Sequence, residues 1–131
     1  MNSSKTESAA RYLLAVMLAV FGADKFFHFL EMPDAPEAGG KFLGALFETG
    51  YIFPTIGAVF LVSALLLMLK RVVLALLLLA PITVNIILYH VTYDVAGIGG
   101  GAVLTALMLV LAVLHAKPMM ALLCGTRSDS K

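Results

Sequence analysis

The chain has 131 residues, of which 61% are hydrophobic and only 13% are charged. A water-soluble domain of this length could not bury so much apolar side chain, because small folds leave much of their surface in water. The formal net charge of +1 argues against a broad nucleic-acid-binding surface. The single cysteine, Cys124, excludes an internal disulfide and a C-x-x-C redox pair. We therefore expect one all-α integral membrane domain over residues 1–131, with the lipid bilayer as its partner and solvent.

The first apolar run predicts a membrane-spanning helix over about residues 11–30, because about 20 apolar residues cross a bilayer core as helix. Lys5 and Arg11 before this run resemble the start of a signal peptide. However, bulky Phe21 stands three places before the candidate cleavage point, and apolar residues resume after Lys25. We therefore expect a retained helix rather than a cleaved leader.

The connection that follows is the one long loop, and we expect it to contain a short helix over about residues 35–49. Asp34 with Glu37 three residues later forms a capping-box pattern at its start. Apolar residues then recur at helical spacing on one face, namely Phe42, Leu43, Leu46 and Phe47. This amphipathic helix would lie at the membrane interface or cap the bundle. An irregular loop is the alternative, because Gly39-Gly40 weakens the first helical turn.

Three more apolar runs complete a predicted bundle of four transmembrane helices. They span about residues 51–69, 72–90 and 98–114. Pro81 is predicted to kink the third of these helices. The glycines between Gly97 and Gly101 begin a small-residue face on the fourth helix, which indicates close packing rather than a dinucleotide loop. The polar tails, residues 1–8 and 125–131, are expected to be disordered.

Basic residues near the span ends predict the orientation of the bundle in the membrane. With a cytoplasmic N-terminus, the cytoplasmic side holds Lys5, Arg11, Lys70, Arg71, Lys117, Arg127 and Lys131. The outer side then carries only Lys41, with Lys25 inside the first span, and several carboxylates. We therefore expect a multi-pass protein of the inner (cytoplasmic) membrane with both termini in the cytoplasm.

Polar and ionisable residues gather in the outer halves of the predicted spans. A charge inside a span costs about 2.5–3.5 kcal/mol on insertion scales, so such groups usually face the bundle or a wet cavity. We therefore expect an outward-facing ligand pocket. Its candidate residues are Asp24, His28, Glu48, Asn85, Tyr89 and His90, with Lys25, Tyr51 and Asp94 as secondary candidates. Asp24 and His28 stand one helical turn apart, where a carboxylate and an imidazole can share or relay a proton.

Several of these candidates have an equally simple structural interpretation. Interhelical hydrogen bonds of about 0.6–2 kcal/mol hold membrane bundles together, so Asn85 suits a structural role as well as a ligand role. Lys25 can extend to the interface as an anchor, and His90 and Asp94 lie near the expected water boundary. No metal site is predicted, because no span carries a dense set of ligands beyond His28, His90 and a carboxylate.

The sequence resembles the DoxX-like family of small four-helix membrane proteins over about residues 11–114. The similarity comprises Arg11, Phe21-Gly22-x-x-Lys25, a short segment before a proline-started second helix, the basic turn Lys70-Arg71, and Pro81-Ile82-Thr83-Val84-Asn85-Ile86-Ile87-Leu88-Tyr89-His90. The family is named for a membrane subunit linked to thiosulfate:quinone oxidoreduction, so the resemblance implies a small membrane protein with a link to quinones. Many relatives carry a Glu followed by Gly in the second helix, where this chain has Val59-Phe60-Leu61-Val62-Ser63-Ala64.

Three functions remain open at this stage. The first is an accessory membrane subunit, not an enzyme on its own, that binds a small apolar ligand such as a quinone in the outward pocket. The second is a membrane subunit of a quinone-linked oxidoreductase, with Asp24 and His28 handling protons. Its electrons would come from a membrane or soluble redox partner, because the chain lacks a haem motif, a flavin fold and a cysteine pair. The third is a small transporter or proton pathway, which the lack of an internal repeat disfavours. A homo-oligomer is compatible with each, and a nucleic-acid partner with none.

Overall fold

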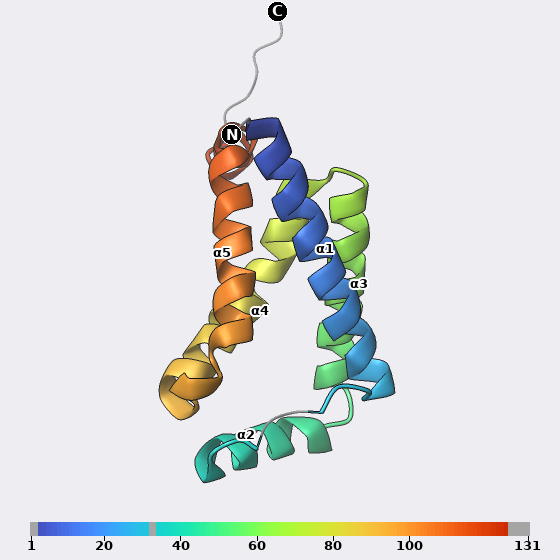
Figure 1. Cartoon of the computed structure of the whole chain (residues 1–131), viewed down its shortest axis with the longest axis vertical. Coiled ribbons are helices and arrows are strands. Elements are labelled where there is room, and N and C mark those ends of the chain that lie inside the picture. Colours follow the sequence, from blue (N-terminus) through green and yellow to red (C-terminus); the bar gives the residue numbers. More distant parts are fainter. Residues whose placement is uncertain (1–2, 32–33, 126–131) are drawn as a thin grey trace, which may run out of the picture.

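The computed structural model describes residues 3–31 and 34–125, and within these ranges the chain is helical, with no strand (Figure 1). The elements in chain order are α1 (Ser3–Phe27), α2 (Glu37–Glu48), α3 (Ile52–Met68), α4 (Val72–Tyr93), the 3-10 turn η1 (Val95–Gly97), α5 (Gly99–Leu114) and α6 (Ala116–Leu123). The prediction of an all-α protein is therefore confirmed.

Helices α1, α3, α4 and α5 run up and down between the same two ends of the molecule (Figure 1). They pack as a ring, with α1 against α3, α3 against α4, α4 against α5, and α5 against α1. The start of α1, the turn between α3 and α4, and the end of α5 lie at one end. Helix α2 lies across the other end, at 84° to α3.

The predicted helix boundaries agree with the structure except near the chain ends and around α2. The polar N-terminal tail is helical from Ser3, so its predicted disorder is wrong for residues 3–8. Helix α6 was not predicted, and the tail beyond residue 125 lies outside the described residues. The capping box at Asp34 is also wrong, because Pro36 is the N-cap of α2 and forms no side-chain cap.

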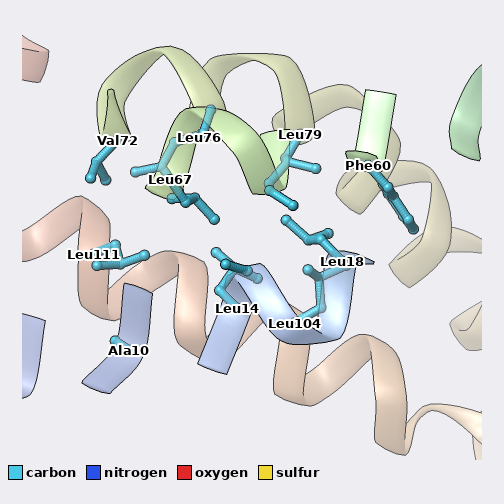
Figure 2. Close-up of a cluster of buried hydrophobic side chains, with 13 residues drawn as sticks. Ala10, Leu14, Leu18, Phe60, Leu67, Val72, Leu76, Leu79, Leu104 and Leu111 are labelled. Carbon is cyan, nitrogen blue, oxygen red and sulfur yellow. The ribbon is translucent and has the colours of Figure 1, made fainter. Parts of the chain in front are cut away.

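Leucines from all four ring helices make the centre of the core, with Leu104 and Leu111 from α5. Leu14 and Leu18 of α1 point toward leucines of α3 and α4, including Leu67 and Leu79 (Figure 2). Each of these side chains is 0–1% exposed. Glycines let α1 and α3 approach closely at one level, since a Cβ atom on Gly57 would lie 2.9 Å from the carbonyl oxygen of Gly22.

The opposite, outward faces of the ring helices are apolar as well. Leu13, Leu65, Leu88 and Val113 are between 58% and 74% exposed. An apolar surface of this extent is typical of a protein that contacts lipid. In the described chain, α4 alone is long and apolar enough to cross a membrane. The pairs α2–α3 and α5–α6 each pass the same test only when counted as one bent span, which gives up to three spans.

A buried arginine joins the helices at the end where α1 starts. Arg11 is 3% exposed, and its Nη1 donates to the carbonyl oxygen of Leu67 at 3.1 Å. Its Nε donates to Glu7 Oε1 at 3.0 Å, and the same oxygen lies 3.4 Å from His115 Nε2. This cluster links α1 to the last turn of α3 and to the end of α5. Arg11 was predicted as a basic residue at the start of the first span, and its buried contacts with α3 and α5 were not predicted.

Candidate ligand-binding site

A cavity of about 300 Å³ lies inside the ring of helices, beneath α2. Its walls are mainly apolar and come from all four ring helices, with Leu18 and Phe21 from α1, Phe60 from α3, Ile86 from α4 and Leu104 from α5. Apolar walls with a few polar groups are typical of sites for small organic ligands.

Helix α2 covers one end of this cavity and is held there by aromatic packing on α4. Phe42 stacks against Tyr89 and Tyr93, with ring centroids 5.9 and 5.6 Å apart. The absence of a side chain at Gly39 permits the approach, because a Cβ atom there would lie 2.8 Å from the Tyr89 hydroxyl oxygen. Leu43, one residue after Phe42, lines the cavity. The predicted apolar face of this helix therefore caps the bundle.

Five of the predicted candidate residues line the cavity. They are Asn85, Tyr89 and His90 from the primary set and Lys25 and Asp94 from the secondary set. Four of them follow one another along the last three turns of α4 and into the turn that follows, and Lys25 comes from α1. The structure thus places the polar groups of the cavity toward the end that α2 covers.

His90 and Asp94 form a local unit at the start of the turn between α4 and α5. His90 Nδ1 lies 3.1 Å from the carbonyl oxygen of Asp94 and 3.9 Å from its Oδ2. Because a carbonyl oxygen can only accept, Nδ1 carries the proton, and in the neutral ring Nε2 is left as an acceptor. Asp94 Oδ1 accepts the Gly97 N–H at 3.2 Å. The Asp94 carboxylate therefore stabilises the turn as well as lining the cavity.

Asn85 and Tyr89 have polar atoms that no described residue satisfies. The side chain of Asn85 forms no hydrogen bond within residues 3–31 and 34–125, so the interhelical bond expected of a structural asparagine is not formed there. The Tyr89 hydroxyl is buried without a hydrogen-bond partner among the same residues. Buried polar groups are usually paired, and the Tyr89 hydroxyl, which is covered beside Gly39 of α2, is an exception. Asn85 is an exposed residue, so its amide is the group that is free to bond a molecule in the cavity that it lines.

Lys25 is the cationic group of the site. Its side chain is half-buried, and its Nζ lies 5.5 Å from the centroid of the Phe53 ring, which is within the range of a cation–π contact. Lys25 and Phe53 line both the main cavity and a smaller, adjoining pocket. Its contacts inside the protein therefore explain the position of Lys25 without the alternative role of an interfacial anchor.

Asp24 and His28 line the adjoining pocket but do not form the predicted proton-sharing pair. Asp24 is buried, and its Oδ1 accepts the Leu30 N–H at 2.7 Å, which caps the end of α1. His28 follows the last residue of that helix with φ of 53°, and its exposed ring packs edge-on against Phe47. No hydrogen bond or ion pair between the two side chains occurs in the described part of the chain. The one-turn spacing failed because the helix ends between them.

Glu48 and Tyr51 are placed away from the cavity. Glu48 is exposed at the end of α2, and Tyr51 is 65% exposed just before α3. Aromatic residues that were not among the predicted candidates, including Phe53 and Phe60, do line it. Neither gives a signal in the sequence beyond being one more apolar residue in an apolar span. Within the described residues, no group of three or more His, Cys, Asp or Glu side chains could hold a metal ion.

Comparisons with protein-family models, with curated proteins and with solved structures give no match to this chain. The resemblance to the DoxX-like family therefore stays a prediction from the residues quoted above.

Proposed function

We propose that the protein is a four-span membrane protein of the inner membrane with both termini in the cytoplasm. Three observations support this proposal. All four ring helices run between the same two ends of the molecule, their outward faces are apolar, and the basic turn Lys70-Arg71 lies at the end where α1 starts. Helices α3 and α5, with 17 and 16 residues, would be short spans that reach the two membrane surfaces through the turns at their ends, while α2 and α6 lie across those ends.

The single cysteine offers a direct test of this orientation. Cys124 is exposed just after α6, so a membrane-impermeant maleimide should label it only after permeabilisation of spheroplasts. In a Cys124→Ser background, Lys41→Cys on α2 should label in intact spheroplasts, because α2 lies at the opposite end. Labelling of Cys124 in intact spheroplasts would overturn the proposed orientation.

For the activity, we propose an accessory membrane protein of DoxX-like type that binds a small, largely apolar ligand such as a quinone. The cavity beneath α2 is the observation that carries this proposal. Its volume of about 300 Å³ is at the lower end of the range for small-molecule sites. Ring carbonyls could accept hydrogen bonds from the Asn85 amide and the Lys25 ammonium, and a flat ring could pack on the aromatic walls.

A binding role is favoured over a redox role by the position of Asp24 and His28. The oxidoreductase interpretation used them as a proton-handling pair, whereas Asp24 is occupied by the Leu30 N–H and His28 lies beyond the helix end. An accessory binding protein needs only the cavity and no proton-handling pair. We therefore propose the accessory binding role rather than the oxidoreductase role.

The test is to purify the protein in native lipid particles without detergent and to identify the co-purifying small molecules by mass spectrometry. Asn85→Leu should lower ligand occupancy, because it removes a polar group from the cavity wall. Thr92→Leu is the matched control, since Thr92 is an exposed polar residue of the same helix that does not line the cavity. Equal occupancy in wild type and Asn85→Leu would contradict the proposal.

A further inference from the structure

We propose that α6 is an in-plane membrane anchor that docks on anionic phospholipid at the end of the bundle where α1 starts. Its apolar face enters the boundary between head groups and acyl chains, and the basic side chains at this end pair with the head-group phosphates. This inference rests on the membrane-spanning bundle of the proposed function. It does not depend on the cavity or on the ligand proposed for it.

Helix α6 turns out of the bundle directly after α5. The two helices meet at His115 with an angle of 83° between them, so α6 lies across the end of the ring. Its eight residues rise about 12 Å, which is far less than the bilayer core of about 30 Å. A helix that lies at about a right angle to a spanning helix is oriented along the membrane surface.

The apolar side chains of α6 share one face of the helix. Met119, Met120, Leu122 and Leu123 fall within an arc of about 160°, and Lys117 lies about 140° from the centre of that arc. Met119 packs against the buried core, so this face is turned toward the bundle and the bilayer around it. Met120, Leu122 and Leu123 lie on the same face and are between 55% and 61% exposed. Acyl chains beside the bundle would cover them.

The charge at this end of the molecule is complementary to an anionic membrane surface. In the described part of this end, the basic side chains are Lys5, Arg11, Lys70, Arg71 and Lys117. Glu7 is the one carboxylate described there, and it pairs with Arg11 at 3.0 Å, so these two charges offset each other. The other four basic side chains are exposed and have no ion pair with a described carboxylate.

An anionic bilayer supplies a partner for both parts of this surface. Its acyl chains meet the apolar face of α6, and its phosphates meet the four exposed basic side chains at the same end. Basic residues near such a leaflet are attracted to it, and the attraction adds to the burial of apolar area by an in-plane helix.

Fluorescence quenching in lipid nanodiscs tests the position of α6. In a Cys124→Ser background, the fluorophore nitrobenzoxadiazole is attached to Leu123→Cys on the apolar face or to Lys117→Cys on the polar face. The discs contain phosphatidylcholine and phosphatidylglycerol. Acyl-chain doxyl lipids should quench the probe at position 123 at least about threefold more than at position 117, and aqueous iodide should give the reverse order. Met120→Cys is a second probe of the apolar face and should behave as position 123 does.

Two results would overturn the in-plane anchor. Equal quenching of both faces by iodide would place α6 in water. Equal quenching of both faces by doxyl lipid would place α6 inside the bilayer core.

A triple variant tests the role of the head groups. Native mass spectrometry of the wild-type protein released from mixed bilayers should show retained phosphatidylglycerol in preference to phosphatidylcholine. Lys70→Gln/Arg71→Gln/Lys117→Gln should lower this preference at least about fivefold. Lys41→Gln is the matched control, because Lys41 is exposed on α2 at the opposite end, and it should keep the preference. An unchanged preference in the triple variant would overturn the docking on anionic lipid.

These outcomes separate the inference from the proposed function. A failure of either test leaves the cavity untouched, because the cavity lies beneath α2 at the other end of the bundle, and ligand occupancy in Asn85→Leu still decides that proposal. Recovery of the wild-type protein in the soluble fraction without detergent would overturn both.

Discussion

The buried guanidinium of Arg11 allows a quantitative test of how the bundle is held together at the end where α1 starts. Its Nη1 donates to the Leu67 carbonyl oxygen, and its Nε pairs with Glu7. A hydrogen bond to a charged group contributes about 1.5–3 kcal/mol. The Leu67 carbonyl also accepts the Lys70 N–H at 3.1 Å, so it is not left unpaired when Arg11 is removed. We therefore expect Arg11→Met to lower the free energy of unfolding by about 2–3 kcal/mol.

The assay is unfolding in mixed micelles with a rising fraction of a denaturing detergent, followed by far-ultraviolet circular dichroism. Glu7→Gln should cost less than about 1 kcal/mol, because the carboxylate is partly exposed and the amide oxygen can still accept from Arg11. The double variant should cost less than the sum of the two single variants, since both act on one contact. Lys117→Met, at an exposed lysine of α6, serves as the control for loss of a positive charge.

A stability of Arg11→Met within about 0.5 kcal/mol of wild type would refute this reasoning, because changes of that size are typical of surface positions without specific contacts. So would a comparable loss in Lys117→Met, since that result would assign the effect to net charge. Strict additivity in the double variant would show that Arg11 and Glu7 act separately.

Three further substitutions follow from local geometry. Lys70 ends α3 in a left-handed conformation with φ of 61°, so Lys70→Gly should raise the free energy of unfolding by about 1 kcal/mol, and no gain would contradict the strain argument. Ser63 is 0% exposed and its Oγ has no hydrogen-bond partner among the described residues; Ser63→Ala should be neutral or stabilising by up to about 1 kcal/mol in the same assay, and a clear loss would reveal a partner. Gly39→Val should displace α2 from Tyr89 and speed amide exchange in that helix, whereas Gly44→Ala, where an added Cβ meets no atom within 4 Å, should leave exchange unchanged. Equal exchange in the two variants would argue against the close approach at Gly39.

Much of the helical framework follows from the length of the apolar runs. In a bilayer every backbone N–H and C=O must be satisfied within the segment, so a long neutral run has few alternatives to a helix. The predicted span over residues 72–90 corresponds to α4, which runs through Pro81 to Tyr93 as one helix. The structure of the chain termini was harder to predict, because it depends on contacts with other helices. The first turns of α1 are joined to α3 through Arg11, and no local pattern indicates that contact.

The sequence predicted how far along each helix the site residues lie, but not which of them face one another. Asn85, Tyr89 and His90 were selected because polar groups inside an apolar span need a protein or water environment, and they do line one cavity. The Asp24–His28 pair failed for a different reason. Helical spacing places residues i and i+4 together only while the helix continues, and His28 leaves the helical conformation. Nothing in the sequence marks this helix end, because the residue is neither Gly nor followed by Pro.

The same packing that holds the helices together also accounts for the cavity. Gly22 and Gly57 allow α1 and α3 to come into close contact, and α2 packs on Tyr89 and Tyr93 across the end of the bundle, with Leu43 and Leu46 lining the space. The apolar walls of this space of about 300 Å³ lack facing atoms and lose dispersion contacts when nothing occupies it. A small apolar ligand would restore those contacts, so we expect binding of the proposed ligand to stabilise the bundle as well as to occupy the site.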